Sequence, residues 1–231
     1  MSLAELGGAP VLSGRIDMPL RRRWVAELQL ATDVAPAGAV LLACAGGLQL
    51  HGVVAISTVY QDSTWVRVVG GRGTPGAMVA TAYAGALLRD PLGAIADAGG
   101  ESIDATSTAS VLGLSLSRWD IAGAMGPALD ALADEAQRQA GGVVSWRFLP
   151  SGALWFGAET WPTLALPAGD VVQDPAQLLR LFPLAVETPT IVPGVELEDI
   201  GRVRYVSHQI GGEGREAPRS IIISSPPRPN P

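Results

Sequence analysis

The chain has 231 residues, of which 48% are hydrophobic and 16% charged, and its formal net charge is −6. This length allows one large domain or two small ones, each with its own buried core. The longest basic run is Arg21–Arg23. Nucleic acid or an anionic membrane is therefore not expected as the main partner, because phosphate binding needs concentrated basic side chains.

Membrane insertion and secretion are also not expected from the sequence. No segment has the roughly 18–20 uninterrupted apolar residues that a membrane-spanning helix needs. The N-terminal MSLAELGGAP lacks the basic start and apolar core of a signal peptide. The single cysteine, Cys44, lies in the apolar run AVLLACAGG and cannot form an intramolecular disulfide. We therefore expect synthesis in a cytoplasm, with Cys44 buried as a small hydrophobic residue.

The first seventy residues contain a series of strand-like runs: RRRWVAELQLA, AVLLACA, LQLHGVVAISTVY and STWVRVVGG. Glycines, prolines and an Asp separate them, which is typical of an antiparallel meander or small barrel. Trp24, Ala26, Leu28 and Leu30 alternate with polar residues and predict one buried face. Residues 1–75 are therefore predicted to form a first small β-barrel.

The pattern changes after about residue 75. The stretches AMVATAYAGALL and DPLGAIADAGG are rich in alanine and indicate helical segments. Within 120–140, Leu129, Leu132 and Ala136 recur at helical spacing, and the glycine pair 141–142 provides a helix stop. The following VVSWRFLPSGALWFG is typical of a strand, a Pro-Ser-Gly turn and a second strand. Residues 76–159 are therefore predicted to form a helix and hairpin module.

The last part of the chain, 160–225, is again strand-rich and is predicted to form a second small β-barrel, followed by a flexible tail over 226–231. Two segments support a duplicated barrel: GLQLHGVVAISTVYQ from Gly47 and GVELEDIGRVRYVSHQ from Gly194. Each has a glycine, a short alternating strand, a second glycine and a longer strand, although two β segments can also be alike by chance. The predicted fold class is α+β, mainly β, with two antiparallel barrels separated by the module.

Titratable residues form no catalytic or metal-binding signature in the sequence. His51 and His208 lie in strand-like runs without a second ligand at zinc spacing, and GLSLS at 113–117 lacks the second glycine of a nucleophile elbow. Glu101 and Asp104 are three residues apart, and a solvated loop fits them better than a glycosidase pair. We therefore predict no catalytic, cofactor-binding or metal-binding residues and no enzyme activity.

Two alternatives stay open at this point. The segment 71–76 matches G-x-G-x-x-G, the loop that brings backbone N–H groups to a dinucleotide pyrophosphate, although a connector between modules fits its position after a meander better. A small enzyme would use this loop for a nucleotide, or Glu101 and Asp104 for a glycan. A carbohydrate-binding module would instead expose the tryptophans of SWRFLPSGALWFGAETWP, which we expect to form a packed hairpin.

Four stretches, in this order, resemble the baseplate hub proteins of tailed bacteriophages, including the late-control D type and contractile-tail hubs. They are DPLGAIADAGGE (90–101), LSRWDIAGAMGPALDALADEA (116–136), VSWRFLPSGALWFGAETWP (144–162) and VPGVELEDIGRVRYVSHQI (192–210). In such hubs a helix precedes a W-x-x-x-x-x-G-x-L-W-x-G hairpin, and a later P-G segment leads to a G-R-V-x-x-V-x-H strand. The matching residues here are Trp146, Gly152, Leu154, Trp155, Gly157, Pro193, Gly194, Gly201, Arg202, Val203, Val206 and His208.

The resemblance implies two tail-tube-like barrels per subunit and a homotrimer whose six barrels form a pseudo-hexameric ring. Such a ring joins the tail tube, or a distal tail protein, to a central spike, contacts other baseplate components and holds DNA only in transit. The resemblance therefore implies a structural virion protein of the tail baseplate, assembled in the host cytoplasm, without a cofactor. The chain is shorter than larger hubs, so any cell-wall-degrading activity is expected in another protein.

Overall fold

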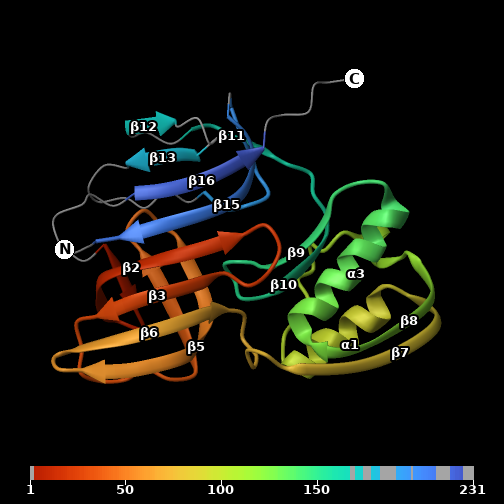
Figure 1. Cartoon of the computed structure of the whole chain (residues 1–231), viewed down its shortest axis with the longest axis horizontal. Helices are drawn as coiled ribbons and strands as arrows, with labels where there is room; N and C mark the ends of the chain where they lie inside the picture. The colour runs from red at the N-terminus through yellow and green to blue at the C-terminus, as the bar shows by residue number, and fades with distance from the viewer. Residues whose placement is uncertain are drawn as a thin grey trace. The chain divides into compact units, whose positions relative to one another are not determined.

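The computed structural model describes residues 3–166, 170–173, 178–182, 191–198, 200–211 and 219–225 (Figure 1). The chain divides into two compact units. Unit 1 contains Met1–Leu20, Trp24–Val69 and Thr160–Pro231, and unit 2 contains Arg21–Arg23 and Gly70–Glu159. The three arginines therefore belong to a different unit from the strands that flank them in the sequence.

Six antiparallel strands of unit 1 close into a barrel in the order β1-β4-β5-β6-β3-β2, because β2 pairs back onto β1. Closure removes the two end strands that an open sheet of six would have. Of the two forms expected for the first seventy residues, the small antiparallel barrel is present, with two additional N-terminal strands. The order is not a simple meander, because β3 pairs with β6 and β2 and not with β4. The strands are β1 (Ala4–Leu6), β2 (Ala9–Pro19), β3 (Val25–Leu30), β4 (Ala39–Cys44), β5 (Gln49–Tyr60) and β6 (Ser63–Gly70).

One face of each strand fills the barrel. Trp24, Ala26, Leu28 and Leu30 are at most 2% exposed, which confirms the burial predicted from their alternation. Leu28 stands opposite Val66 of β6, and both are buried. Complete burial of a leucine or valine side chain contributes about 1.5–3 kcal/mol, so this apolar face is the main source of the barrel's stability.

The sheet continues from β2 into the C-terminal strands, as the strand-rich composition of this region predicts. β15 (Gly201–Ile210) pairs with β2, and β16 (Arg219–Ser225), β13 (Leu178–Phe182) and β12 (Asp170–Gln173) follow in that order. β14 (Glu196–Leu197) joins β15 to β11 (Thr163–Leu164). Closure of a second barrel stays a prediction, and the predicted tail over 226–231 lies outside the described residues.

The two segments that suggested a duplication differ in local structure. The segment from Gly47 runs through Gly52 inside the single strand β5, whereas the segment from Gly194 forms β14 and then β15. Gly201 begins β15 with φ of 113°, the corner conformation that glycine allows. Gly52 has another reason to be glycine, because a Cβ there would lie 2.7 Å from the Trp24 ring. The duplication of the two barrels stays a prediction.

Unit 2 contains a two-stranded sheet where the alanine content of 77–88 predicts a helix, so that prediction is wrong. β7 (Met78–Leu87) pairs antiparallel with β8 (Ser115–Ala124) along its length. Val79 is buried between exposed Met78 and Ala80, which is strand periodicity. Pairing with a distant strand overrides the helix propensity of alanine, and local composition does not reveal that partner.

The helices of unit 2 are α1 (Arg89–Gly99), the short α2 (Ala109–Leu112) and α3 (Met125–Ala140). The helix predicted within 120–140 begins later than expected, because the first residues complete β8. Leu129, Leu132 and Ala136 are fully buried, as their spacing predicts. Gly141 ends α3 with φ of 70°, and its N–H donates to the Gln137 carbonyl, which confirms the predicted helix stop.

The predicted hairpin follows α3. β9 (Val144–Phe148) and β10 (Leu154–Ala158) pair antiparallel, with Trp146 opposite Phe156 and Phe148 opposite Leu154. The rings of Trp146 and Phe148 lie edge to face, 6.4 Å apart, and both are at most 3% exposed. The two faces therefore meet in a packed core, as expected.

Candidate functional site

The glycine loop 71–76 packs against the end of α1. The N–H of Thr74 donates to the Gly99 carbonyl oxygen at 2.9 Å. A Cβ on Gly73 would lie 1.8 Å from the same oxygen, so close backbone packing explains this glycine. The loop leads from β6 into strand β7, whereas a dinucleotide loop leads from a strand into a helix.

Glu101 and Asp104 have separate structural roles. The Glu101 side chain is fully buried; its Oε1 lies 2.8 Å from Arg23 Nη1, and its Oε2 accepts the Arg72 N–H at 2.8 Å. Asp104 Oδ1 accepts the Thr106 N–H at 2.8 Å in an exposed turn. The expected solvated loop is therefore right for Asp104 and wrong for Glu101, whose charge partner is distant in sequence.

The two histidines lie in different surroundings. His51 is exposed on β5. His208 is fully buried on β15, with Nε2 3.3 Å from the Ile191 carbonyl oxygen. Burial disfavours the charged ring and lowers the pKa of His208 to about 4. A buried neutral ring of this kind is a packing residue that resists protonation.

The remaining candidates offer no nucleophile or metal site. Cys44 is 7% exposed, as expected, and burial raises the pKa of its thiol to about 12. Ser115 and Ser117 lie exposed on strand β8, outside any strand-to-helix elbow. In the part of the chain that the structure describes, no three His, Cys, Asp or Glu side chains are grouped to hold a metal ion.

The tryptophan-rich stretch does not form an open platform. Trp146, Trp155 and Trp161 are 2%, 9% and 7% exposed. Trp146 Nε1–H donates to Asp130 Oδ1 at 2.8 Å, and Trp155 Nε1–H donates to the Thr106 carbonyl at 3.1 Å. Sugar stacking needs an exposed ring face, so these rings do not provide the carbohydrate site that we considered.

The β5–β6 hairpin instead exposes a cluster of large apolar side chains. Ile56, Val59, Tyr60 and Trp65 are 59%, 44%, 64% and 49% exposed. The other five tryptophans, all within the described ranges, are at most 9% exposed. We call these four residues the hairpin cluster. Large apolar side chains exposed on one hairpin make it a candidate interaction surface.

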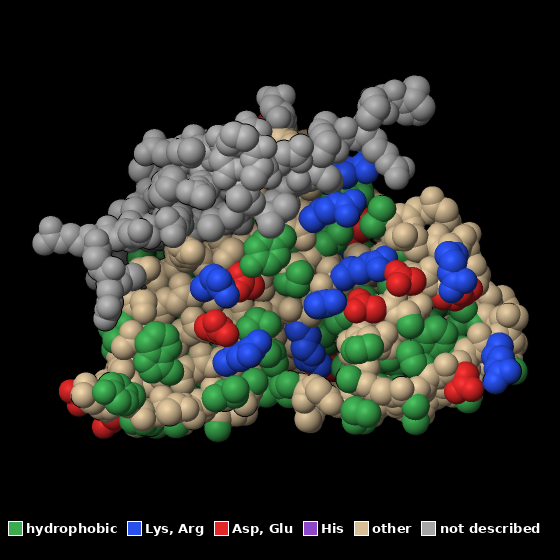
Figure 2. All heavy atoms as spheres, viewed as in Figure 1, with side chains coloured by type: hydrophobic (Ala, Val, Ile, Leu, Met, Phe, Trp, Pro, Cys, Tyr) green, Lys and Arg blue, Asp and Glu red, His purple; other side chains and the backbone are tan. Residues whose placement is uncertain are grey.

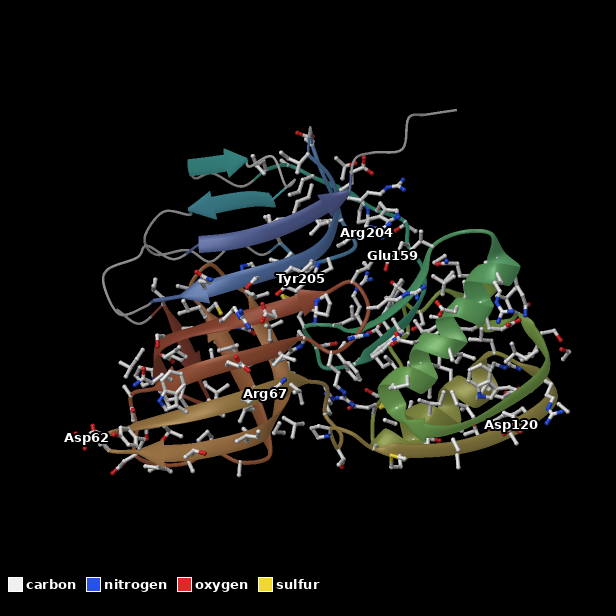
Figure 3. The ribbon with its side chains drawn as sticks, in the orientation of Figure 1. Asp62, Arg67, Asp120, Glu159, Arg204 and Tyr205 are labelled. Atoms are coloured by element: carbon white, nitrogen blue, oxygen red, sulfur yellow. The ribbon has the colours of Figure 1, made fainter. Side chains whose placement is uncertain are left out.

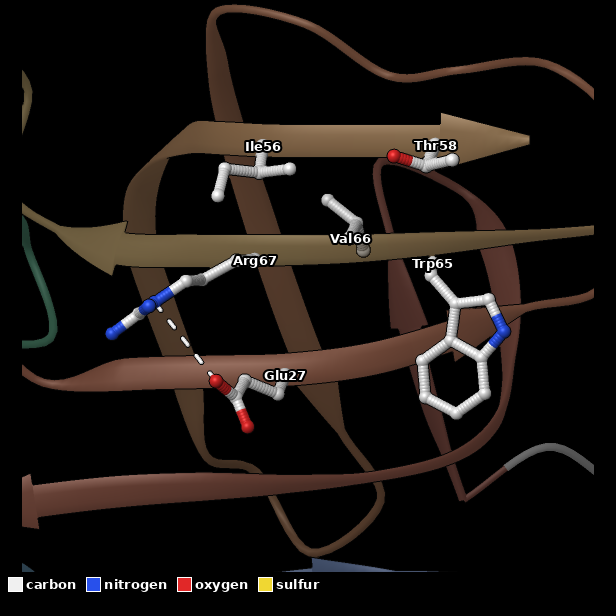
Figure 4. A pocket seen from close by; sticks show the side chains of 6 residues that line it. All are labelled: Glu27, Ile56, Thr58, Trp65, Val66 and Arg67. Carbon is white, nitrogen blue, oxygen red and sulfur yellow. Dashed lines mark ion pairs between the residues drawn. The ribbon is translucent and has the colours of Figure 1, made fainter. Parts of the chain in front are cut away.

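A shallow hollow of about 250 Å³ adjoins the hairpin cluster on the outer face of the barrel (Figure 4). Arg67 Nε and Glu27 Oε1 lie 4.0 Å apart there, and both side chains are about half exposed. An exposed ion pair at this distance contributes little, so both charges can turn to a partner. The lining residues are Glu27, Ile56, Thr58, Trp65, Val66 and Arg67.

In the part of the chain that the structure describes, half of β5 pairs on one side only. The pairing of β4 with β5 ends at Ala39 and Val53, and one further bond joins the Val54 N–H to the Gly38 carbonyl at 2.9 Å. Over residues 55–60, β5 pairs with β6 alone among the described strands. Unpaired backbone groups along such an edge are a template for another strand.

Charges of opposite sign alternate across the outer face of the barrel. Gln209, Arg15, Glu27 and Arg67 stand opposite one another on the successive strands β15, β2, β3 and β6. Figure 2 shows acidic and basic side chains interspersed on the visible face. Figure 3 places Arg67 along β6 and Asp62 at the tip of the hairpin. Mixed charge of this kind suits a protein partner better than a polyanion.

Sequence reasoning did not identify the hairpin cluster. Leu50 and Gly52 are buried, whereas Ile56 and Thr58 line the outer hollow, so the inside-to-outside alternation of β5 shifts between Gly52 and Ile56. A hydrophobic strand sequence does not reveal such a shift. One sequence signal was available for the exposure of Trp65. Trp65 shares a strand face with the charged Arg67 in STWVRVV, which indicates a ring on the outer face.

No protein-family model matches this chain, and no relative among curated proteins matches it. Solved structures match over nearly the whole chain. One is the E. coli c3393 protein, a type VI secretion system component structurally similar to the T4 bacteriophage tail proteins gp27 and gp5. It matches with a TM-score of 0.56 and 11% identity, over 96% of this chain and 76% of that chain. The chain has the fold of phage-tail-like proteins.

A second match supports the same conclusion. The tail protein from Neisseria meningitidis MC58 matches with a TM-score of 0.57 and 9% identity, over 95% of this chain and 94% of that chain. The predicted resemblance to tail hub proteins and the mainly β fold class are thus confirmed at the level of the fold.

Among the described residues, no helix is long and apolar enough to cross a membrane.

Proposed function

We propose that this chain is a structural hub subunit of a phage tail or of a phage-derived injection machine. The observation that carries the proposal is the shared fold, which covers 96% and 95% of the chain in the two matches. One match is a tail protein and the other a component of a secretion system, so the proposal includes both kinds of machine.

The proposed assembly is a homotrimer. Each copy contributes the closed barrel and a second barrel built from residues 160–225, and the module over 76–159 lies between them in sequence. Three copies then supply six barrels, arranged in a ring with pseudo-six-fold symmetry. The exposed hairpin cluster supports an oligomer, because a lone monomer would leave this apolar surface in water.

In this assembly the ring joins the tail tube, or a distal tail protein, to a central spike. It lies among other baseplate components of the virion and is assembled in the host cytoplasm. DNA passes through the ring only in transit. The mixed charges of the outer barrel face support protein neighbours over a lasting contact with nucleic acid.

The proposed role is structural rather than catalytic. Three of the candidates for chemistry have packing roles: Gly73 lies against the Gly99 carbonyl, Glu101 pairs with Arg23, and His208 is buried. Titration of the folded chain with NAD(P) and nucleotides, and an assay on peptidoglycan, test the alternative. A signal lost in folded Gly73→Ala or Glu101→Gln protein would favour an enzyme.

The decisive experiment is native mass spectrometry and light scattering of the purified full chain over a dilution series. We expect the mass of three copies, and co-purification with the tube and spike proteins of the same particle. A monomer at every concentration that binds no tail component would overturn the hub proposal. A trimer that binds neither neighbour would reject the joining role.

A further inference from the structure

The free half of β5 lacks the devices that keep an exposed strand edge from pairing. Its residues 55–60 are Ala, Ile, Ser, Thr, Val and Tyr, without a charge or a proline. Exposed edges in proteins are usually protected by lysine, proline or a covering segment. β-branched and aromatic residues favour strand pairing, so this edge has the composition of one that is covered in use.

The exposed side chains of the β5–β6 hairpin are of the residue types that contribute most binding energy in protein interfaces. Ile56, Trp65 and Arg67 line the hollow on the outer face of the hairpin, and Tyr60 ends β5. Tyr60, Trp65 and Arg67 are each about half exposed or more. Tryptophan, tyrosine and arginine are enriched among residues that lose most binding energy when truncated. Backbone pairing at the edge and apolar burial in the hollow are thus available to one partner.

A second strand of the same sheet pairs on one side only within the described residues. β12 (Asp170–Gln173) is the last strand of the sheet and pairs only with β13 among the described strands. Among the described strands, the β7–β8 ribbon also has free edges, but Gly85, with φ of 64°, is not paired with β8 and interrupts β7. Among the described strands, β11 also pairs on one side only but has two residues, so the free half of β5 and β12 are the longer backbone edges of this sheet.

We propose that the free half of β5 of one copy pairs with β12 of a second copy, so that the hairpin cluster is buried between copies. The inference rests on the proposed homotrimer and names its contact surface. Two different edges give a head-to-tail contact, and such contacts repeat around an axis until a ring closes. A contact between two β5 edges would instead give a two-fold dimer and leave β12 free.

The first test compares charged variants of exposed residues. Ile56→Lys with Tyr60→Lys places two charges at the edge, and both side chains are more than half exposed in the monomer, so folding is preserved. Met78→Lys is the matched control, because Met78 is 72% exposed in unit 2. By native mass spectrometry we expect the double variant to be monomeric where wild type and Met78→Lys are trimeric. A double variant that stays trimeric would overturn the inference.

The second test locates the partner edge by disulfide formation. Thr58→Cys is combined with Val171→Cys in one variant and with Val172→Cys in another. Successive strand residues alternate between faces, so in the paired sheet one of the two β12 positions shares a face with Thr58. Mild oxidation should give covalent dimers and trimers in one of them, and Cys44 is buried and does not compete.

The outcomes separate this inference from the hub proposal. A wild-type trimer without a crosslink in either variant overturns the β5–β12 pairing and leaves the proposed trimer intact. A wild-type monomer overturns the trimer itself, and the inference with it. A crosslinked dimer of Thr58→Cys alone would show β5 paired with β5, which also contradicts the inference.

Discussion

Arg23 and Glu101 form a buried ion pair within unit 2, with Nη1 and Oε1 2.8 Å apart and no exposed surface on the Glu101 side chain. Arg23 also donates to the Gly70 carbonyl at 2.6 Å, and its guanidinium lies 4.2 Å over the Phe148 ring. The pair therefore connects the arginine segment, the loop after β6 and the hairpin. Both oxygens of the Glu101 carboxylate therefore have a partner within unit 2, Arg23 for Oε1 and the Arg72 N–H for Oε2.

Glu101→Gln should destabilise unit 2. The substitution leaves the Arg23 guanidinium without its charge partner, and removing one member of a buried pair costs about 3–5 kcal/mol. Arg23 is 15% exposed, so we expect the lower end, about 3 kcal/mol. Urea unfolding followed by circular dichroism measures the loss. Asp104→Asn, in an exposed turn, is the control and should cost about 1 kcal/mol or less; equal losses would contradict the role of the ion pair.

Two glycine substitutions should have opposite effects. Gly73→Ala places a Cβ against the Gly99 carbonyl, and overpacking of this kind costs about 1–3 kcal/mol. Gly93→Ala adds a methyl group on α1 where no atom lies within 4 Å, and should stabilise by about 0.5–1 kcal/mol. Differential scanning calorimetry should show a lower Tm for the first and a higher Tm for the second. A Gly73→Ala protein as stable as wild type would show that the close contact is absent.

His208 should make the stability of unit 1 depend on pH. Burial lowers its pKa from 6.5 to about 4, so the unfolded chain takes up the proton first. The stabilisation from the neutral ring is complete above pH 6.5 and is lost as the pH falls towards 4, by about 3 kcal/mol. Urea unfolding at several pH values measures this slope. His208→Gln should flatten it and His51→Gln should not; equal slopes for wild type and His208→Gln would contradict the assignment.

The features predicted correctly from the sequence are those specified within one element or between close neighbours. The alternation from Trp24 to Leu30 identifies the buried face of β3, and the spacing of Leu129, Leu132 and Ala136 identifies that of α3. The β9–β10 hairpin is joined by a short turn, so both strands and their register are local. Periodicity and turn chemistry suffice in these cases.

The features that the sequence did not predict depend on partners far away along the chain. β7 is a strand because β8 pairs with it, although its alanines favour a helix. Glu101 can be buried because it forms an ion pair with Arg23, and no sequence spacing relates the two positions. The free half of β5 depends on where β4 stops pairing, at Val53. The candidate surface was therefore not visible from residue types alone.

Trp65 provides a direct readout of this surface in solution. It is 49% exposed while the other tryptophans are at most 9% exposed, so iodide should quench one accessible emission component in the monomer. We expect this component in the Ile56→Lys, Tyr60→Lys variant and its loss when Trp65→Phe is added. Trp155→Phe in the same background is the control and should retain it.

Wild-type trimer should lack the accessible component, because the neighbouring copy covers the Trp65 ring. Quenching that survives Trp65→Phe would mean that another tryptophan ring is exposed, contrary to the packed hairpin. Quenching in the wild-type trimer equal to that in the monomeric variant would mean that copies meet elsewhere. The apolar hollow would then be expected to bind a different tail component. An exposed tryptophan near an unpaired strand edge is unfavourable in water unless a partner covers it.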